Sequence, residues 1–274
     1  MSGSGTGEPE RRAALGAIAS SGRFAVTAEM PTVDTADPAA IASLVAPLLG
    51  HVDAISCTDN SGAHAHVSSV AVAKVLLDHG FEPIAQFACR DRNRLALQSD
   101  LLGASALGIR NICIMTGDDV TAGDHPDAKR VFDLDSTQLI RIASELRDGE
   151  RYLSGRALSG SPSYTIGAVE NPFAPPMEFR PARLAKKIEA GAEFVFTQIA
   201  FDLDVLGRFM AQVVDRTARA RRHPGVGVRP GIGARGAVHP SRSRGTAFLT
   251  KSCAGWKGFP ETVRRTRVFA SRAT

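Results

Sequence analysis

Long apolar runs and paired cysteines are missing from this sequence. No stretch approaches the roughly 18 consecutive apolar residues that cross a bilayer, which excludes a membrane-spanning helix. The first dozen residues are mainly glycine, serine and charged residues, so we expect a loose terminus and not a secretory signal. The four cysteines form no Cys-x-x-Cys pair, so we expect reduced thiols in a cytoplasmic protein without a membrane partner.

Acidic residues are almost absent from the C-terminal part of the chain. From Arg216 onward there are 14 Lys or Arg and a single acid, Glu261, whereas the first 215 residues hold 19 basic and 27 acidic residues. The formal net charge of +5 therefore comes from the tail alone. A basic tail can bind nucleic acid. This tail has one Trp and no Tyr among its basic residues, so we expect no specific nucleic-acid partner.

Six short apolar runs each end in a polar residue or a cysteine, at intervals typical of one β-strand plus one helix. These ends are Glu29, Asp59, Cys89, Asp118, Glu170 and Gln198. In a parallel β/α barrel the C-terminal ends of all strands meet on one face, so these residues would share one pocket. A length of 274 residues also suits a single barrel domain. The sequence therefore predicts an α/β fold, a (β/α)8 barrel of the TIM type, with chemistry at the strand ends.

The apolar pattern and the capping residues give each element approximate bounds. We expect strands over 23–29, 54–58, 83–89, 111–115, 164–169 and 194–198, and helices over 38–49, 67–79, 92–107, 134–146, 181–190 and 205–219. The same interval predicts strand seven near 226–228 and strand eight near 256–259, but the second of these is not strand-like. We therefore expect a disordered segment over 1–20, a barrel domain over 21–224 that lacks its eighth strand, and an atypical basic tail over 225–274.

Motifs at the strand ends occur in the order typical of one enzyme family. They are Thr27-Ala-Glu29-Met-Pro31, Ser56-Cys-Thr58-Asp-Asn60, Met115-Thr-Gly117-Asp118, Gly167-Ala-Val-Glu170-Asn-Pro172, Lys186-Lys187-Ile-Glu-Ala-Gly191-Ala and Phe196-Thr-Gln198-Ile-Ala-Phe201-Asp202. Over about residues 24–204 the ordered set resembles the methylenetetrahydrofolate reductase family. The resemblance implies a barrel that carries FAD at its strand ends. It implies an oxidoreductase of one-carbon metabolism and methionine biosynthesis, which passes hydride from NADH or NADPH through the flavin to 5,10-methylenetetrahydrofolate and forms 5-methyltetrahydrofolate.

The resemblance also implies roles for individual residues. Glu29 falls on the family's acid that protonates the folate ring nitrogen, a task for a carboxyl group whose pKa partial burial can raise. Asp118 falls on the aspartate beside the flavin and the pterin ring, and it joins Glu29 as a catalytic residue. Gln198 matches the glutamine that pairs with the pterin edge through one donor and one acceptor. The residues on the flavin side are Thr58, Gly117, Asp118 and Lys187, and no metal is implied.

The sequence departs from the family at three positions that would touch the flavin. Gln86 stands where a histidine is common, Thr116 where an arginine is common, and Ala168 where a tyrosine is common. One cation from the loop after the third strand, Arg90, Arg92 or Arg94, can replace the missing charge. The alternatives are weak binding of FAD, or direct hydride transfer from the nicotinamide nucleotide to the folate.

Three other constellations fit different chemistry less well. His64 and His66 lack a third ligand with recognisable spacing, so a metal site is not expected. A Schiff-base lysine would suit a strand better than Lys187 in its helical Lys-Lys pair. The glycines of 225–236 do not lie between a strand and a helix, so a phosphate-binding loop is not expected there.

A change of reading frame would also explain the basic tail. Residues 248–260, back-translated with GC-rich codons and read from the third base, can encode a charged helical segment that resembles this family's segment after strand seven. We hypothesise that a frame change between about Gly225 and His239 replaced the native C-terminal part and left the barrel open. The alternative function is then a catalytically impaired or inactive folate- or flavin-binding barrel. The expected partner is a folate, and the sequence leaves the oligomeric state open, a homo-oligomer included.

Overall fold

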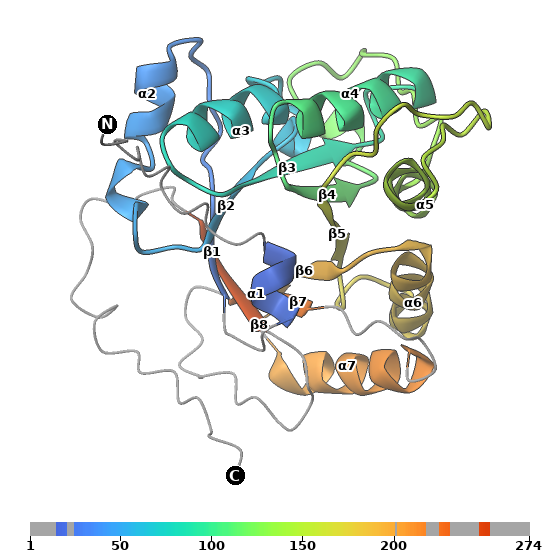
Figure 1. Ribbon diagram of the computed structural model, residues 1–274. Coiled ribbons are helices and arrows are strands. Elements are labelled where there is room, and N and C mark those ends of the chain that lie inside the picture. Colours follow the sequence, from blue (N-terminus) through green and yellow to red (C-terminus); the bar gives the residue numbers. More distant parts are fainter. Residues whose placement is uncertain (1–14, 21–24, 201, 218–224, 231–246, 253–274) are drawn as a thin grey trace, which may run out of the picture.

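The computed structural model of the chain describes residues 15–20, 25–200, 202–217, 225–230 and 247–252. Its centre is a closed barrel of parallel strands, in which each strand pairs with the next and the last pairs with the first (Figure 1). The strands are β1 (Ala25–Glu29), β2 (Ala54–Cys57), β3 (Pro83–Ala88), β4 (Asn111–Met115), β5 (Thr165–Glu170), β6 (Phe194–Ala200), β7 (Gly225–Pro230) and β8 (Ala247–Ser252). The barrel predicted from the strand-end pattern is confirmed.

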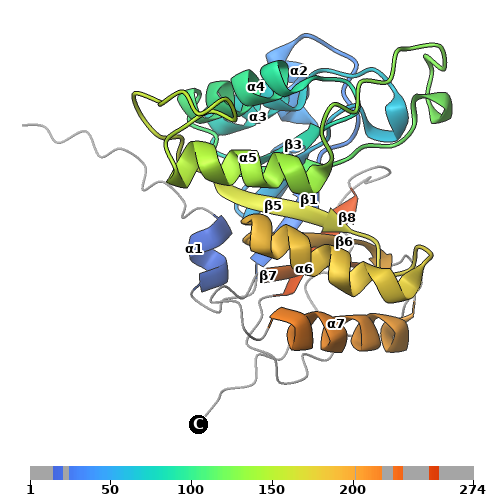
Figure 2. The ribbon, with the colours of Figure 1, turned by 90° about the vertical axis from the view of Figure 1, so that its right-hand side faces the viewer.

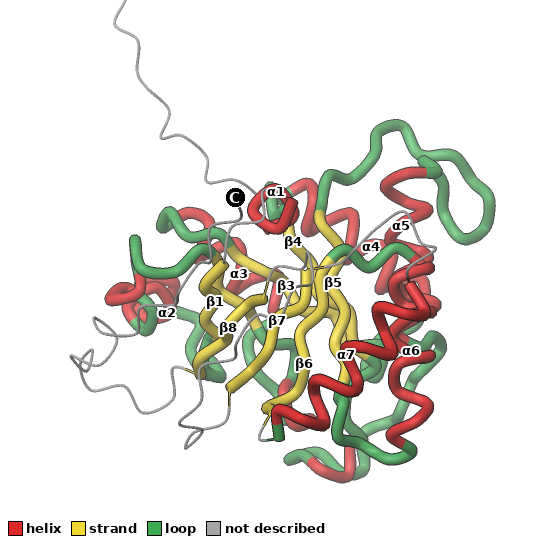
Figure 3. Tube along the Cα trace, turned by 90° about the horizontal axis from the view of Figure 1, so that it is seen from below, coloured by secondary structure: helices red, strands yellow, loops and turns green. Residues whose placement is uncertain are grey.

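Helices pack around the outside of this barrel (Figure 3). They are α1 (Leu15–Ser20), α2 (Pro38–Ser43), α3 (Ser69–Asp78), α4 (Arg94–Ala106), α5 (Ser136–Asp148), α6 (Arg180–Ala190) and α7 (Leu203–Thr217), with 3₁₀ turns η1 (Ala46–Leu48), η2 (Ser61–Ala63), η3 (Val120–Ala122) and η4 (Met177–Phe179). The largest apolar cluster fills the space between the sheet and α2 to α5. Among the described residues, no helix combines the length and apolar character that crossing a lipid bilayer requires.

Capping side chains explain why several predicted helices begin where they do. Asp37 precedes Pro38, and its carboxylate accepts a hydrogen bond from the Ala39 N–H at 2.9 Å. Asp135 and Gln138 form a reciprocal capping box at the start of α5. These side chains satisfy N–H groups that the first turn of a helix leaves without partners. A cap is a local feature, so it can be identified from the sequence alone.

The eighth strand corrects the expectation that the barrel lacks one. Ala247–Ser252 pairs with β1 along its whole length, with Ser252 opposite Glu29, and it also pairs with β7. It begins only 22 residues after the start of β7, at Gly225, whereas most strand ends are 28 to 30 residues apart. Counting by the longer interval therefore predicted this strand too far along the chain. Within the described ranges, neither β7 nor β8 is followed by a helix.

Helix α1 covers the end of the barrel where the strands begin (Figure 2). Leu15 and Ile18 are buried in a cluster with Phe194, and the Leu15 N–H donates to Asn111 Oδ1 at 3.0 Å. The expectation of disorder up to residue 20 is therefore wrong for residues 15–20, and residues 1–14 lie outside the described part. A helix of six residues is too short to show a period in the sequence, and only its packing against the barrel reveals it.

Gly167 on β5 leaves room inside the barrel for the ring of Phe194 on β6. A methyl group added at Gly167 would lie 2.2 Å from that ring, which is itself held edge to face against Phe196. We expect Gly167→Ala to lower the free energy of unfolding by about 1–3 kcal/mol, because a packed interior accommodates added volume poorly. Urea unfolding measures the change. The control is Gly103→Ala in α4, where the added methyl meets nothing within 4 Å; an equal loss in both variants would refute the packing argument.

Three thiols of the described chain, those of Cys57, Cys89 and Cys113, are free and buried, and Cys253 lies outside the described residues. Burial raises the pKa of each, to about 12 for Cys89 and Cys113, from an ordinary value of 9.0. Above pH 9 the unfolded chain then binds fewer protons than the folded protein. The free energy of unfolding is therefore expected to fall with rising pH, by up to about 1.4 kcal/mol per pH unit for each thiol. Urea unfolding at several alkaline pH values checks this, and Cys57→Ala should make the fall shallower.

Candidate active site

A cavity of about 520 Å³ opens at the C-terminal ends of the strands. The residues of the predicted site that line it are Glu29, Thr58, Gly117, Asp118, Lys187 and Gln198. Of the other strand ends noted in the sequence, Asp59 and Glu170 also line the cavity, whereas Cys89 is buried away from it. Side chains that are up to 169 residues apart in the chain, from Glu29 to Gln198, therefore share one hollow.

Strand ends aim Glu29 and Gln198 into this cavity. Glu29 is the last residue of β1, and the following Met30 N–H still bonds to the Ser56 carbonyl at 2.8 Å, which keeps β1 in register with β2 to its end. In β6 the register shifts between Phe196 and Ile199, where the strand bulges. Because a bulge breaks the alternation of side chains, three successive residues of β6, Phe196, Thr197 and Gln198, line the cavity.

Thr197 brings a second polar group to the cavity wall. Its side chain is 2% exposed, and its hydroxyl oxygen has no hydrogen-bond partner among the described residues. Buried hydroxyl groups are normally satisfied, so an orphaned one in a cavity wall is suited to bonding a ligand. Thr197 was not among the predicted site residues, because the bulge in β6 cannot be recognised from the pattern of apolar residues.

Asp118 and Asp119 follow β4 but face different environments. The carboxylate of Asp119 bonds to Arg130 at 2.8 Å and to the Thr121 N–H and hydroxyl. Those bonds lower the pKa of Asp119, with Arg130 making the largest contribution. The Asp118 carboxylate lies at the cavity and accepts no hydrogen bond from the described residues. Of the two neighbouring acids, only Asp118 is therefore available to a ligand.

Helix α6 contributes a cationic wall around one buried carboxylate. Glu170 is fully buried and accepts two bonds from Arg183, at 2.6 and 3.0 Å, and one from Lys187 at 3.3 Å. Lys187 is 3% exposed and also donates to the Val169 carbonyl at 2.6 Å. A third cation, Arg180, lies 3.9 Å from Glu170. Burial lowers the pKa of Lys187, and the Glu170 carboxylate acts in the opposite direction.

The three cations outnumber the one carboxylate, so this side of the cavity is positive, whereas Glu29 and Asp118 bring acidic groups to the ends of β1 and β4. The sequence analysis missed Arg180 and Arg183. Their signal was present, because positions 180, 183 and 187 follow the i, i+3, i+7 spacing of one helix face. Lys186, the other member of the Lys-Lys pair, is exposed.

Three arginines follow β3, two in the loop and Arg94 at the start of α4, and one of them lines the cavity. Arg94 bonds to Asp133 at the surface, and a second arginine, Arg92, pairs with Asp59 and Asp100. Arg90 lines the cavity, but its guanidinium is already bound to the Asp91 carboxylate. Of the three arginines expected to supply a cation to a flavin, only Arg90 therefore lines the cavity. Its positive charge is already paired with the Asp91 carboxylate.

The departures from the family pattern lie in different surroundings. Gln86 lines the cavity and donates to Ser56 Oγ at 2.8 Å, and Thr116 lines it with its hydroxyl bonded to Ser136. Ala168 is completely buried in the apolar core, so it does not touch the cavity, contrary to expectation. Its side chain faces the helices because residues alternate along β5.

The two histidines of the loop after β2 bond within the protein. His64 Nδ1 lies 3.0 Å from the Gly62 carbonyl oxygen, and His66 Nδ1 lies 3.0 Å from Asp34 Oδ1. Over the described ranges, no group of three His, Cys, Asp or Glu side chains could hold a metal ion.

The sequence and the fold are similar to those of known folate proteins. A sequence model of the family described as methylenetetrahydrofolate reductase matches residues 16–227. Methylenetetrahydrofolate reductase 2 of Schizosaccharomyces pombe is 29% identical over 168 residues, which are 60% of this chain and 25% of that protein. A probable methylenetetrahydrofolate reductase (NADPH) of Caenorhabditis elegans is 29% identical over 145 residues, which are 52% of this chain and 20% of that protein. The alignments thus span a quarter or less of these relatives' lengths.

A solved structure shares the fold at low sequence identity. It is an uncharacterized protein from Clostridium thermocellum, described as binding two copies of 5-methyl-5,6,7,8-tetrahydrofolic acid. The TM-score is 0.51 at 10% identity, over 76% of this chain and 65% of that chain. At this identity the likeness concerns the fold alone.

Proposed function

Because this chain belongs to the methylenetetrahydrofolate reductase family, we propose that it reduces 5,10-methylenetetrahydrofolate to 5-methyltetrahydrofolate with NADH or NADPH, by way of FAD. The observation that carries the proposal is the shared cavity of Glu29, Asp118 and Gln198. A barrel alone would not support a particular reaction, since the same scaffold hosts many. Three polar side chains of the expected types, gathered at the strand ends, do support one.

In the proposed reaction Glu29 donates a proton to the folate ring nitrogen and so opens the five-membered ring. Its carboxyl group is half-buried at the end of β1, in a cavity that also contains Lys187 and the acids Asp118 and Glu170. A general acid must lie within hydrogen-bond reach of the atom that it protonates. A side chain at a rigid strand end meets this requirement better than one on a mobile loop.

Asp118 and Gln198 would orient the pterin ring of the substrate. A pterin presents amino and N–H donors along one edge and a carbonyl acceptor beside them. The Asp118 carboxylate, which accepts no hydrogen bond from the described residues, can accept from these donors. The Gln198 amide supplies both a donor and an acceptor. Holding the ring in a fixed pose supports hydride transfer, because orientation removes much of the entropic cost of reaction.

The cationic wall of α6 suits the negatively charged phosphate groups of FAD. Arg180, Arg183 and Lys187 exceed Glu170 by two positive charges, and Arg183 remains partly exposed to the cavity. Thr58 offers a hydroxyl group at the β2 end, and Gly117 lets a ligand approach the backbone closely. When bound, FAD would take up hydride from the nicotinamide and deliver it to the folate. Ala168 on β5 stands where the family commonly has a tyrosine, so no aromatic side chain at that position stacks against the flavin ring.

The experiment is the absorption spectrum of the purified protein, followed by turnover. We expect a flavin band near about 450 nm, either on isolation or after FAD is added and free FAD removed. Oxidation of NADH or NADPH coupled to 5,10-methylenetetrahydrofolate should follow. Turnover without a flavin band would favour direct hydride transfer. Absence of both would refute the proposed reduction, and binding of a folate without turnover would support the alternative below.

The alternative is an impaired or inactive barrel that binds folate or flavin. The observation behind it is that the family match ends at residue 227, close to where the chain becomes strongly basic. The frame-change hypothesis remains a prediction. The nucleotide sequence of the gene tests it, because stop codons in the alternate frame would rule it out. A compact monomer or oligomer on gel filtration that also unfolds cooperatively would count against an impaired barrel as well.

A cytoplasmic location is part of the main proposal and agrees with the buried free thiols.

A further inference from the structure

Arg90, in the loop after β3, has the largest side chain among the fully buried residues of the described chain, and it is 2% exposed. A buried arginine is costly unless its charge is paired and its five N–H donors are used. This one lies at the wall of the candidate site, so its bonding partners bear on the function of the cavity.

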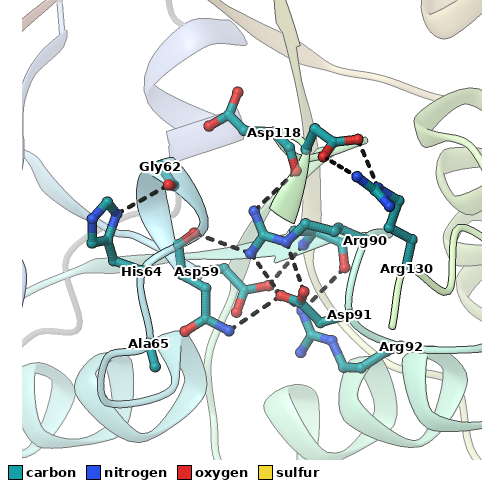
Figure 4. A network of polar contacts seen from close by, with 12 residues as sticks. Asp59, Gly62, His64, Ala65, Arg90, Asp91, Arg92, Asp118 and Arg130 are labelled. Atoms are coloured by element: carbon teal, nitrogen blue, oxygen red, sulfur yellow. Dashed lines mark hydrogen bonds and ion pairs between the residues drawn. The ribbon is translucent and has the colours of Figure 1, made fainter. Parts of the chain in front are cut away.

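The guanidinium of Arg90 joins three loops at the mouth of the barrel (Figure 4). Its Nε and Nη2 atoms donate to the two carboxylate oxygens of Asp91, at 2.6 and 2.7 Å. The Nη2 atom also donates to the Asn60 carbonyl, after β2, at 3.0 Å. The Nη1 atom donates to the Asp118 carbonyl, after β4, at 3.3 Å. One side chain therefore ties the loops after β2, β3 and β4 together.

The contact with Asp118 is made through the backbone and leaves the side chain available. Figure 4 shows the Asp118 carbonyl oxygen turned toward Arg90 and its carboxylate turned away from the network. Within the described part of the chain that carboxylate accepts no hydrogen bond and forms no close ion pair, although its negative charge contributes to the raised pKa of Arg90. Arg90 thus holds the residue in position through its backbone and leaves the carboxylate oxygens free to accept hydrogen bonds.

The loop after β4 is also shaped to fit the Arg90 side chain. Gly117 has a φ of +96°, a conformation that favours glycine, and a Cβ atom there would lie 3.0 Å from Arg90 Cβ. Asn60, at a φ of +46°, donates through its side chain to Asp91 at 3.2 Å and so fixes the carboxylate that orients the guanidinium. Packing and hydrogen bonds agree on one arrangement of the three loops.

We propose that Arg90 is a positioning residue that sets the direction of the Asp118 carboxylate, with Asp91 and Asn60 fixing its guanidinium. The positive charge of Arg90 is paired with the Asp91 carboxylate, so Arg90 does not serve as a replacement cation for a flavin. The consequence for ligand binding rests on the proposed function. The consequence for the loop after β4 does not, and the two can be measured separately.

Hydrogen exchange tests the loop without any ligand. The N–H groups of 121–123 bond to Asp119 and Val120, directly after Asp118. Lysine cannot reproduce the guanidinium fork, so Arg90→Lys should speed their exchange about tenfold. The matched control is Arg92→Lys, two residues along, which breaks ion pairs with Asp59 and Asp100 but does not contact Asp118. Equal acceleration in both variants, or none in Arg90→Lys, overturns the proposal. If Arg90→Lys does not fold, Asp91→Asn takes its place in the same exchange measurement, because it keeps the arginine but removes the carboxylate that pairs with it.

A double-mutant cycle tests the action through Asp118. Affinity for 5-methyltetrahydrofolate is measured by calorimetry for the wild type, Arg90→Lys, Asp118→Asn and the double variant. We expect Arg90→Lys to weaken binding about tenfold in the wild-type background and less than about twofold in the Asp118→Asn background. Equal losses in the two backgrounds overturn the proposal. If the wild type binds no folate, the proposed function fails, and hydrogen exchange alone decides the role of Arg90.

Discussion

Glu29→Gln is expected to lower kcat for 5,10-methylenetetrahydrofolate reduction by about 10²- to 10⁴-fold, the range typical for loss of a general acid. Glutamine keeps the size and the hydrogen-bonding shape of the side chain but has no transferable proton. The strand end that holds Glu29 stays paired through the Met30 N–H, so the fold should be unaffected. Steady-state kinetics with thermal unfolding as a check on folding measure both quantities.

The two half-reactions separate a proton donor from a binding residue. Because the proposed proton goes to the folate, reduction of bound flavin by NADH or NADPH should change by less than about twofold in Glu29→Gln. Oxidation of the reduced flavin by the folate should carry the whole loss. Stopped-flow absorbance follows each half-reaction. A similar loss in both would show that Glu29 shapes the cavity and does not deliver the proton.

Glu170→Gln is expected to lower the free energy of unfolding by about 3 kcal/mol, because removing one partner of a buried ion pair leaves the other charge uncompensated. The carboxylate is fully buried, and Lys187, 4% exposed in its side chain, depends on it. Urea unfolding at neutral pH measures the loss. The matched control is Glu189→Gln, on the exposed face of α6, which should change stability by less than about 0.5 kcal/mol.

Lys187→Met in the Glu170→Gln background should restore part of the lost stability, since it removes the stranded ammonium group. The double variant has lost one cation and one carboxylate and keeps the net charge of the wall through Arg180 and Arg183, so its affinity for FAD should change by less than about threefold. If Glu170→Gln and Glu189→Gln cost the same, Glu170 is not the counterion on which the wall depends.

The sequence predicted those features of the fold that have local causes. The start of α2 followed from Asp37 and Pro38, and the strand ends followed from apolar runs that stop at a polar residue. The capping box of Asp135, which starts α5 two residues after the predicted position, is a local signal that was overlooked. The class of barrel followed from the repeat of these signals. The short interval before β8 and the packing of α1 have no local signature, because both depend on contacts with distant strands.

In the candidate site, too, features with a local cause could be predicted and features that depend on distant contacts could not. Strand geometry alone brings Glu29, Asp118 and Gln198 to one face, so their meeting could be predicted. The partners that position and charge the cavity lie in loops and on α6, and they could not be predicted in this way. The sequence offered Arg90 only as one of three candidate cations and placed Arg183 within a predicted helix, and their bonding partners, the Asp118 carbonyl and the Glu170 carboxylate, appear only in the fold.

The pairing of β8 with β1 has a consequence for biosynthesis. The strand that bears Glu29 has β2 on one side and, on the other, a strand that begins only at Ala247. During translation β1 therefore keeps an open edge until Ala247–Ser252 has left the ribosome. Unpaired edges of parallel sheets are prone to aggregate while they wait. The candidate cavity is thus enclosed on the side of β8 only after this strand emerges, and the nascent chain is most exposed to aggregation before that point.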